Sequence, residues 1–549
     1  MPLDLTQLLS LVEEMPAYHR LVAALPSKKS IRAVVLDTAK PYLMAALYQH
    51  WRLPMLVLTA QPESGKRLYE QLSIWSGARV KLFPESVVLP YERITSDTDT
   101  ELERVQVLSA LADYSRDKVA AAPPLVIASA PALMSQTVPY ADFAAAGHVI
   151  QPGLEIEPFQ LLGRWAAMGY RRENIVEIPG TMSHRGGIID IYPLTSELPV
   201  RLEFFGNTVE SLRFFGPVNQ RSLGTASPVA IGPATELLGP LPGNKSEVEQ
   251  ILGNLDLSGC TVEVRQQFQE ELGELFDKQK PRHRQFYASL FHRDSLMNYL
   301  PHSALLVLDE PREIKQTVAD LDAEAEQMRA EKLDRGELPC HFSRPYFTWE
   351  ELAPMIEGRQ CLALTAWSAD EESPRLDFTS VLSYAGQLPS FVKMVKQLIG
   401  QKRRLLLVSH QADRLSELLG EENIIVSPLT EVRQTPLPGS LTLIHGSLAD
   451  GWMMNNDTYL FTDAEIFGFV KQRRQVKRRP VSHQKLFVDI TPGDFVVHVE
   501  HGVGRFTEVA NLSIGGGEKE YLVMRYATGD KLYVPTDQID RVNRYIGAS

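Results

Sequence analysis

Short apolar runs alternate with segments of helical periodicity between residues 31 and 133. The helical segments repeat apolar residues at the spacing of one helix face, as in ELERVQVLSALADY. Strands that alternate with helices form a parallel sheet whose faces the helices cover. The sequence therefore predicts an α/β fold for this part of the chain. The apolar runs are AVVL at 33–36, MLVL at 55–58, VKLF at 80–83 and PLVIAS at 124–129.

The chain is too long to form a single hydrophobic core. Its 549 residues correspond to roughly three to five domains of ordinary size. The pattern changes after Pro152, where strands of alternating polarity are separated by turns rich in glycine and proline. This pattern predicts an antiparallel insertion within the α/β fold.

Helical periodicity returns after about Gly239, and a second α/β pattern follows the first. The apolar run LLVL places Asp309 and Glu310 at the carboxyl end of a predicted strand. The last part of the chain has only strand patterns, which predicts a small β-barrel. The predicted domains are 1–140 and 238–346 for the two parts of the parallel-sheet domain, 141–237 for the insertion, 347–470 for the second α/β domain, 471–485 for a basic linker and 486–549 for the barrel.

One stretch resembles a phosphate-binding loop but lacks two of its required residues. The sequence AQPESGKR at 60–67 contains the Gly65-Lys66 pair after an apolar run. A working loop reads GxxxxGK[ST], in which the first glycine shapes the turn and the hydroxyl holds Mg²⁺. Ala60 replaces that glycine and Arg67 replaces the hydroxyl, so the stretch is not expected to bind a nucleotide.

Charge and cysteine usage exclude several classes of protein. A formal net charge of −12 argues against a protein that coats nucleic acid non-specifically, since such binding requires many Lys and Arg residues. The basic run KQRRQVKRR at 471–479 predicts a solvated linker or a segment that docks on phosphate or protein.

The three cysteines form no CxxC pair, which favours a reducing compartment and argues against structural zinc. No apolar run is long enough to span a membrane, so a cytoplasmic location is expected.

Two segments resemble known families. The stretch GYRRENIVEIPGTMSHRGGIIDIYPLTSELPVRLEFFGNTVESLRFF is similar to the second domain of UvrB, the damage-verifying helicase of bacterial nucleotide excision repair. The C-terminal stretch VVHVEHGVGRFTEV, with EYLVMRYATGDKLYVPTDQIDRVNRYIG, resembles the RNA-polymerase-interacting domain that the CarD regulators share with the transcription-repair coupling factors. In this order, the two segments together resemble the bacterial transcription-repair coupling factors.

The resemblance implies a degenerate P-loop NTPase/helicase-like domain and a CarD/Tudor-like barrel. In register with UvrB, residues 36–42 replace the phosphate loop, and Pro41 has no N–H to offer a phosphate. Lys40, Asp309 and Glu310 then mark a degenerate nucleotide site, in which the two acids are expected to cap a helix and lie on the surface. The resemblance implies no catalytic residue, metal or cofactor in this chain, because the family's ATP and Mg²⁺ bind in a motor half that is absent here.

The same resemblance implies two protein partners. The damage sensor UvrA is expected to dock on Arg171, Arg172 and Arg185, although Ser183 replaces a third basic position. The β subunit of RNA polymerase is expected to bind the barrel by strand addition. DNA is expected to bind chiefly through the absent motor domains. The candidate polymerase-binding residues are Val499, Glu500, His501 and Arg505.

Two other functions are compatible with parts of the sequence. An active UvrB-like ATPase and helicase would bind ATP through Lys40 or Lys66. A CarD-like transcription regulator would carry the remaining domains as an incidental extension. The favoured hypothesis is a binding scaffold that engages a stalled polymerase and recruits UvrA for transcription-coupled repair.

Overall fold

The computed structural model describes most of the chain in two compact units, Met1–Gln472 and Arg473–Ser549. We describe each unit separately. The described residues are 3–544 without 78–79, 87–89, 94–97, 117–121, 227, 239–252, 254, 277–283, 368–372, 469–492, 494, 499–501, 515–516, 527–530 and 536–541.

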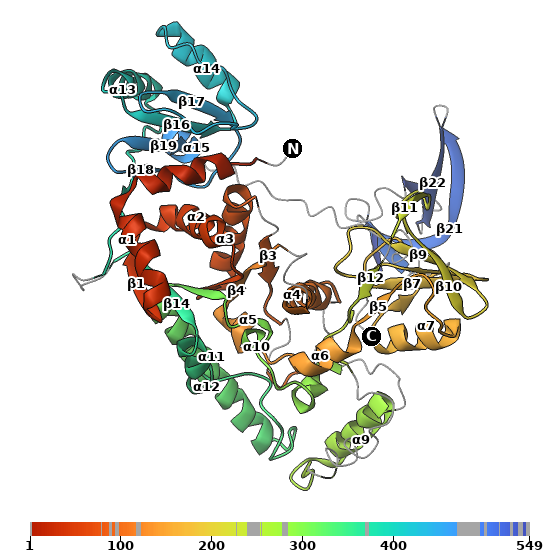
Figure 1. The fold of residues 1–549 in the computed structure, drawn as a ribbon. Coiled ribbons are helices and arrows are strands. Elements are labelled where there is room, and N and C mark those ends of the chain that lie inside the picture. The colour runs from red at the N-terminus through yellow and green to blue at the C-terminus, as the bar shows by residue number, and fades with distance from the viewer. Residues whose placement is uncertain are drawn as a thin grey trace. The chain divides into compact units, whose positions relative to one another are not determined.

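The first sheet of the larger unit has six parallel strands in the order β1-β14-β13-β2-β4-β3 (Figure 1). The middle residues of the four inner strands are buried, as expected for a sheet that is covered on both faces. The predicted parallel α/β fold is confirmed. The strands are β1 (Ser30–Val34), β2 (Met55–Thr59), β3 (Val80–Phe83), β4 (Leu125–Ser129), β13 (Leu305–Asp309) and β14 (Gln360–Thr365).

Strand β14 lies between β1 and β13, so this sheet continues past residue 346, where the sequence suggested a domain boundary. The apolar run CLAL gives no sign of which sheet it joins, because both predicted α/β domains have such strands. The helices associated with the sheet include α2 (Lys40–Trp51), α3 (Pro62–Trp75), α4 (Thr98–Arg116), α5 (Ala130–Met134), α11 (Pro311–Asp334) and α12 (Trp349–Glu357).

The insertion forms a second six-stranded sheet in the order β11-β10-β9-β8-β7-β6. Every neighbouring pair is antiparallel except β6 with β7, so the predicted antiparallel character is largely confirmed. The strands are β6 (Arg171–Arg172), β7 (Thr181–Arg185), β8 (Ile188–Ile191), β9 (Val200–Phe205), β10 (Thr208–Phe215) and β11 (Ser222–Thr225), and helix α7 (Pro158–Ala167) precedes them.

The second α/β domain has a mixed sheet in the order β15-β18-β19-β16-β17. The central strand β16 (Arg404–Ser409) is parallel to both of its neighbours, β17 (Leu441–His445) and β19 (Thr458–Thr462). The edge is completed by β18 (Trp452–Met454) and β15 (Phe378–Thr379), which pair antiparallel. The helices of this domain are α13 (Leu388–Gly400), α14 (Ala412–Glu421) and α15 (Asp463–Phe467).

Two N-terminal helical segments precede the first sheet. They are the 3-10 helix η1 (Thr6–Glu14) and helix α1 (Pro16–Ala24), in which Pro16 occupies the first position. Of the helices among the described residues, none is long and apolar enough to cross a membrane. Smaller elements of this unit are β5 (His148–Ile150), β12 (Val229–Ile231), α6 (Tyr140–Ala146), α9 (Val262–Phe276) and α10 (Leu296–Tyr299).

The smaller unit is a five-stranded antiparallel sheet in the order β23-β22-β21-β20-β24. Its apolar centre contains Val496, Phe506, Leu522 and Met524. Phe506 is buried, so its ring belongs to the core of this sheet. The strands are β20 (Phe495–His498), β21 (Gly502–Ile514), β22 (Gly517–Arg525), β23 (Lys531–Pro535) and β24 (Val542–Arg544).

Candidate binding sites

The structure brings Lys40, Asp309 and Glu310 together at the carboxyl end of the first sheet. Lys40 is the first residue of α2, Asp309 is the last residue of β13, and Glu310 follows it. The Lys40 ammonium lies 2.6 Å from Asp309 Oδ1 and 2.8 Å from Glu310 Oε1. Asp37, just before the helix, adds a third carboxylate at 2.6 Å. The predicted degenerate nucleotide site is therefore occupied by a cation of the chain itself.

The expectation that Asp309 and Glu310 cap a helix and lie on the surface is wrong. Their side chains are 23% and 29% exposed and both bind Lys40, and the Glu310 side chain makes no capping bond to α11. The backbone of Glu310 is left-handed, with a φ of 53°, which is unusual for a residue with a side chain. Its Oε1 also accepts a hydrogen bond from the Ala366 amide at 2.7 Å. These contacts hold the acid in a strained position that sequence pattern does not reveal.

The ion cluster shifts the protonation equilibria of its members. Burial favours the neutral form of Lys40, but the Asp309 charge and the hydrogen bonds to the carboxylates outweigh it, so the pKa of Lys40 is raised above its ordinary value. Burial also raises the pKa of Asp309, and the Lys40 charge opposes that rise. Three carboxylates face one ammonium, so an incoming phosphate would meet excess negative charge.

The second phosphate-loop candidate, AQPESGKR, is helical rather than a loop. Helix α3 starts at Pro62 and includes Gly65, which is buried. A Cβ at Gly65 would lie 3.3 Å from Thr59 Oγ1, so close packing against β2 explains this glycine without a phosphate. Lys66 is exposed, and Arg67 lies 3.9 Å from Asp450.

The carboxyl end of the second α/β sheet is also filled by the chain. The buried Asp463 carboxylate accepts a hydrogen bond from the Ser409 hydroxyl and another, at 3.0 Å, from the His410 amide. Ser409 ends β16 and Asp463 follows β19. Ligands of open α/β sheets bind where the strand order reverses, at this edge. Here an internal carboxylate takes the hydrogen-bond donors that a ligand would use.

The arginines of the insertion lie on two neighbouring strands. Arg171 pairs with Thr181 and Arg172 with Met182 in the β6–β7 register. Side chains alternate between the faces of a strand, so Arg171 lies on the face of Thr181 and Arg185, and Arg172 lies on the opposite face. The structure therefore groups Arg171 with Arg185.

A buried acid that sequence pattern does not single out orders this face. Asp190 is 1% exposed and binds Arg201 through two contacts of 2.8 and 2.9 Å. Its Oδ2 also lies 3.2 Å from Arg185 Nη2, so Asp190 fixes one of the candidate docking arginines. Ser183, which faces Asp190 in the β7–β8 register, is buried and cannot reach a partner protein.

In the smaller unit, Arg505 is the candidate residue that the structure describes. It is exposed on β21, where its Nε donates to the Gly493 carbonyl at 2.8 Å and its guanidinium lies 6.0 Å from the Phe495 ring. Phe495 is itself 57% exposed. Val499, Glu500 and His501 lie outside the described residues, as do the basic run 471–479 and the whole predicted linker 471–485.

Comparisons with known proteins place two family domains on this chain. The UvrB interaction domain matches residues 149–237, and the CarD-like/TRCF RID domain matches residues 490–546. The chain is 28% identical to the transcription-repair-coupling factor of Bacillus subtilis over 95% of its own length and 45% of the relative's. The resemblance to the transcription-repair coupling factors is confirmed.

Other coupling factors give the same result. The Myxococcus xanthus protein is 27% identical over 93% of this chain and 45% of its own length. The Staphylococcus aureus protein is 24% identical over 99% of this chain and 47% of its own length. The chain thus spans just under half the length of these curated relatives, and the two matched domains contain the arginine face of the insertion and Arg505.

Proposed function

We propose that this chain is the scaffold part of a transcription-repair coupling factor. Its insertion captures UvrA, and its smaller unit, a CarD/Tudor-like barrel, binds the β subunit of RNA polymerase. The observation that carries the proposal is the presence of both family domains, in this order, on one chain. Such a protein recruits the repair machinery to a stalled polymerase and acts in the cytoplasm.

The first sheet supports a scaffold role because its ligand-binding edge is already filled. Lys40, Asp309 and Glu310 form a degenerate nucleotide site in a P-loop NTPase/helicase-like domain. A phosphate would have to displace carboxylates that lie within 2.8 Å of the ammonium. In the family, ATP hydrolysis and DNA translocation belong to the motor domains, so we propose no catalytic residue, metal or cofactor for this chain.

UvrA capture tests the first half of the proposal. We expect the immobilised chain to bind purified UvrA and the Arg172→Ala/Arg185→Ala variant to bind it roughly 10- to 100-fold more weakly, because each arginine offers charge-assisted hydrogen bonds to carboxylates. Surface plasmon resonance gives the affinities. The matched control is Arg32→Ala, which removes an exposed arginine of β1 and should leave binding unchanged.

Single variants show which face UvrA contacts. If the face of Arg185 binds UvrA, Arg171→Ala should weaken capture more than Arg172→Ala. Equal binding by the double variant and the intact chain would contradict the proposed UvrA site.

Polymerase binding tests the second half. We expect Arg505→Ala to weaken binding of the full chain to RNA polymerase about tenfold, because the variant loses an exposed cation and its hydrogen bond to the Gly493 carbonyl. Co-sedimentation with purified polymerase measures the loss. Glu508→Gln, an exposed change on the same strand, serves as the control, and equal loss in both variants would argue against a specific role for Arg505.

A further inference from the structure

The N-terminal segment Leu3–Ala24, which we call the strap, contacts both α/β domains of the larger unit. In Figure 1 the red helical segment nearest the N-terminus lies next to the domain that contains β16 to β19, and α1 lies beside the first sheet. Toward the first domain, the Tyr42 hydroxyl donates a hydrogen bond to the Leu8 carbonyl at 2.8 Å, and the Leu5 amide donates one to the Ile74 carbonyl at 3.2 Å. Leu5, Leu8 and Leu11 are fully buried, so the strap is part of this core.

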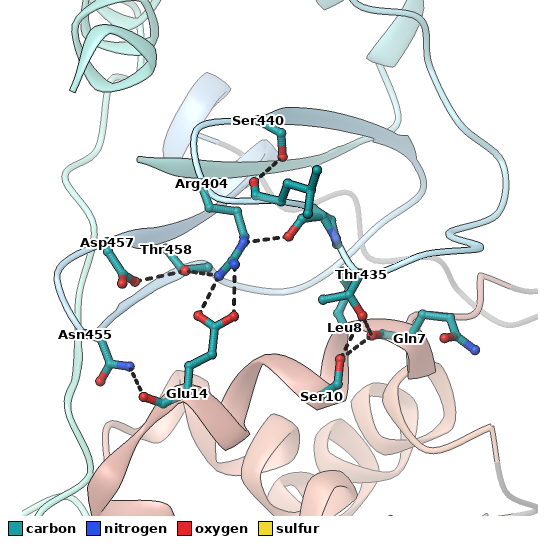
Figure 2. Close-up of polar contacts among 12 residues, drawn as sticks. Gln7, Leu8, Ser10, Glu14, Arg404, Thr435, Ser440, Asn455, Asp457 and Thr458 are labelled. Carbon is teal, nitrogen blue, oxygen red and sulfur yellow. Dashed lines mark hydrogen bonds and ion pairs between the residues drawn. The ribbon is translucent and has the colours of Figure 1, made fainter. Parts of the chain in front are cut away.

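Toward the second domain, Glu14, the last residue of η1, makes a two-point ion pair (Figure 2). Glu14 Oε1 and Oε2 accept hydrogen bonds from Arg404 Nη2 and Nη1 at 2.9 and 3.0 Å. The Arg404 side chain is 4% exposed. Its Nε also donates to the Pro436 carbonyl and its Nη1 to Thr458 Oγ1. Glu14 is the carboxylate that pairs this buried charge.

Three more polar contacts accompany the ion pair (Figure 2). The hydroxyls of Ser10 and Thr435 lie 2.9 Å apart, and Thr435 donates to the Gln7 carbonyl at 3.4 Å. Asn455 Nδ2 donates to the Glu14 carbonyl at 3.4 Å. The contacts come from separate loops of the second domain, so the strap fixes several points of that domain and not a single loop.

An aromatic cluster joins the two domains beside the strap. Tyr42 of α2 lies with its ring centroid 5.0 Å from Trp75 of α3 and 4.8 Å from Trp452 of β18. Phe378 of β15 is 5.3 Å from Trp452. All four rings are buried and belong to one continuous apolar core with Leu8 and Leu11. The same tyrosine that packs between the domains therefore donates its hydroxyl to the strap.

We infer that the strap holds the two α/β domains in one orientation, so that this part of the chain works as a rigid body. Rotation of one domain against the other would pull Glu14 away from Arg404. The arginine would then be a buried charge without its partner, which is strongly unfavourable. A two-domain motor must open and close around its nucleotide, and the strap opposes that movement.

The aromatic cluster alone could also hold the domains together, and Glu14 distinguishes the two explanations. The Glu14 side chain is 44% exposed, so its replacement creates no cavity in the apolar core. Glu13 is exposed and one residue away, and its carboxylate makes no hydrogen bond or ion pair among the described residues. Glu13→Ala is therefore a control of equal charge change.

The test is a distance distribution between spin labels on the two domains of the full chain. Lys66→Cys on α3 and Lys393→Cys on α13 are exposed label sites, and Cys340→Ser removes the exposed native cysteine. Pulsed electron paramagnetic resonance should give one narrow distribution for the labelled parent and for Glu13→Ala, with or without ATP and Mg²⁺. Glu14→Ala should broaden the distribution at least twofold or add a second distance.

A second variant keeps the inference testable if Glu14→Ala does not fold. Ser10→Ala with Asn455→Ala removes two strap contacts and leaves no buried charge unpaired, and it should broaden the distribution to a smaller extent. An unchanged narrow distribution in both Glu14→Ala and this double variant would overturn the inference and assign the fixed orientation to the aromatic cluster. A broad distribution in the parent would overturn it as well.

Discussion

Lys40→Met is expected to destabilise the first α/β domain by about 3–5 kcal/mol, the usual cost of removing one partner of a buried ion cluster. The change leaves Asp309 and Glu310 close together, and both side chains are mostly buried. Urea denaturation followed by tryptophan fluorescence measures the loss. Lys66→Met is the matched control, because Lys66 is exposed on α3 and its loss should change stability by less than about 0.5 kcal/mol.

The destabilisation by Lys40→Met should depend on pH in a defined direction. Burial raises the pKa of Asp309, so the folded state holds that proton more tightly than the unfolded state does. Without the opposing Lys40 charge, the pKa of Asp309 rises further. Stability linked to such a group increases as the pH falls. The difference between the parent and the variant should therefore be smaller at about pH 5 than at about pH 7.5.

An ATPase would respond differently to the same change. In a phosphate loop the lysine reaches a phosphate, so its replacement abolishes nucleotide binding and leaves the fold intact. A stable Lys40→Met variant that had lost ATP binding measured by calorimetry would favour the ATPase hypothesis over the scaffold. Loss of stability, without ATP binding in the parent, would support the degenerate site.

Asp190→Ala is expected to destabilise the insertion by about 3–5 kcal/mol, because it removes the buried carboxylate that pairs Arg201 and Arg185. Arg201 would remain over the Phe215 ring at 4.6 Å without its carboxylate. Hydrogen exchange of the β7, β8 and β9 amides measures the free energy of opening of this sheet. Asp190→Asn keeps the shape of the side chain and should reduce the stability of the sheet less, because the amide oxygen still accepts a hydrogen bond.

The control for Asp190 is Glu210→Ala, which removes an exposed acid of β10. It should leave exchange in β7 to β9 unchanged. If Asp190→Ala exchanged at the parental rate, the contacts of Asp190 would contribute nothing to the stability of the sheet. UvrA capture by the folded Asp190→Asn variant would then show separately whether Arg185 needs its anchor.

Local pattern was sufficient to predict the parallel sheet and the insertion. The runs at 55–58 and 124–129 became β2 and β4, because buried parallel strands require continuous apolar residues. Turn residues likewise predicted the antiparallel strands after Pro152. The resemblance, and not the pattern, selected Lys40 over Lys66 as the residue of the predicted degenerate nucleotide site.

Long-range contacts could not be predicted in the same way. The pairing of Lys40 with residues some 270 positions later requires that β1, β13 and β14 be neighbours in the sheet. The hydrophobic periodicity of a sequence does not determine the order of its strands. Asp190 lies in the apolar sequence GIIDIYP, where an acid suggests an exposed position until its arginine partners are known. Glu14 carries no sequence signal at all, since its partner Arg404 lies in an apolar strand.

The position of β14 sets the order in which the first sheet can be completed. Strand β1 is at the edge of that sheet, and its neighbour is β14, which is synthesised some 330 residues later. Until residue 365 leaves the ribosome, the apolar side chains of β1 have no strand to pair with, and unpaired strands of nascent chains are prone to aggregate. The insertion and most of the parallel sheet can form earlier, so β1 joins this sheet only after them. During synthesis β1 must therefore wait for β14 before it can pair.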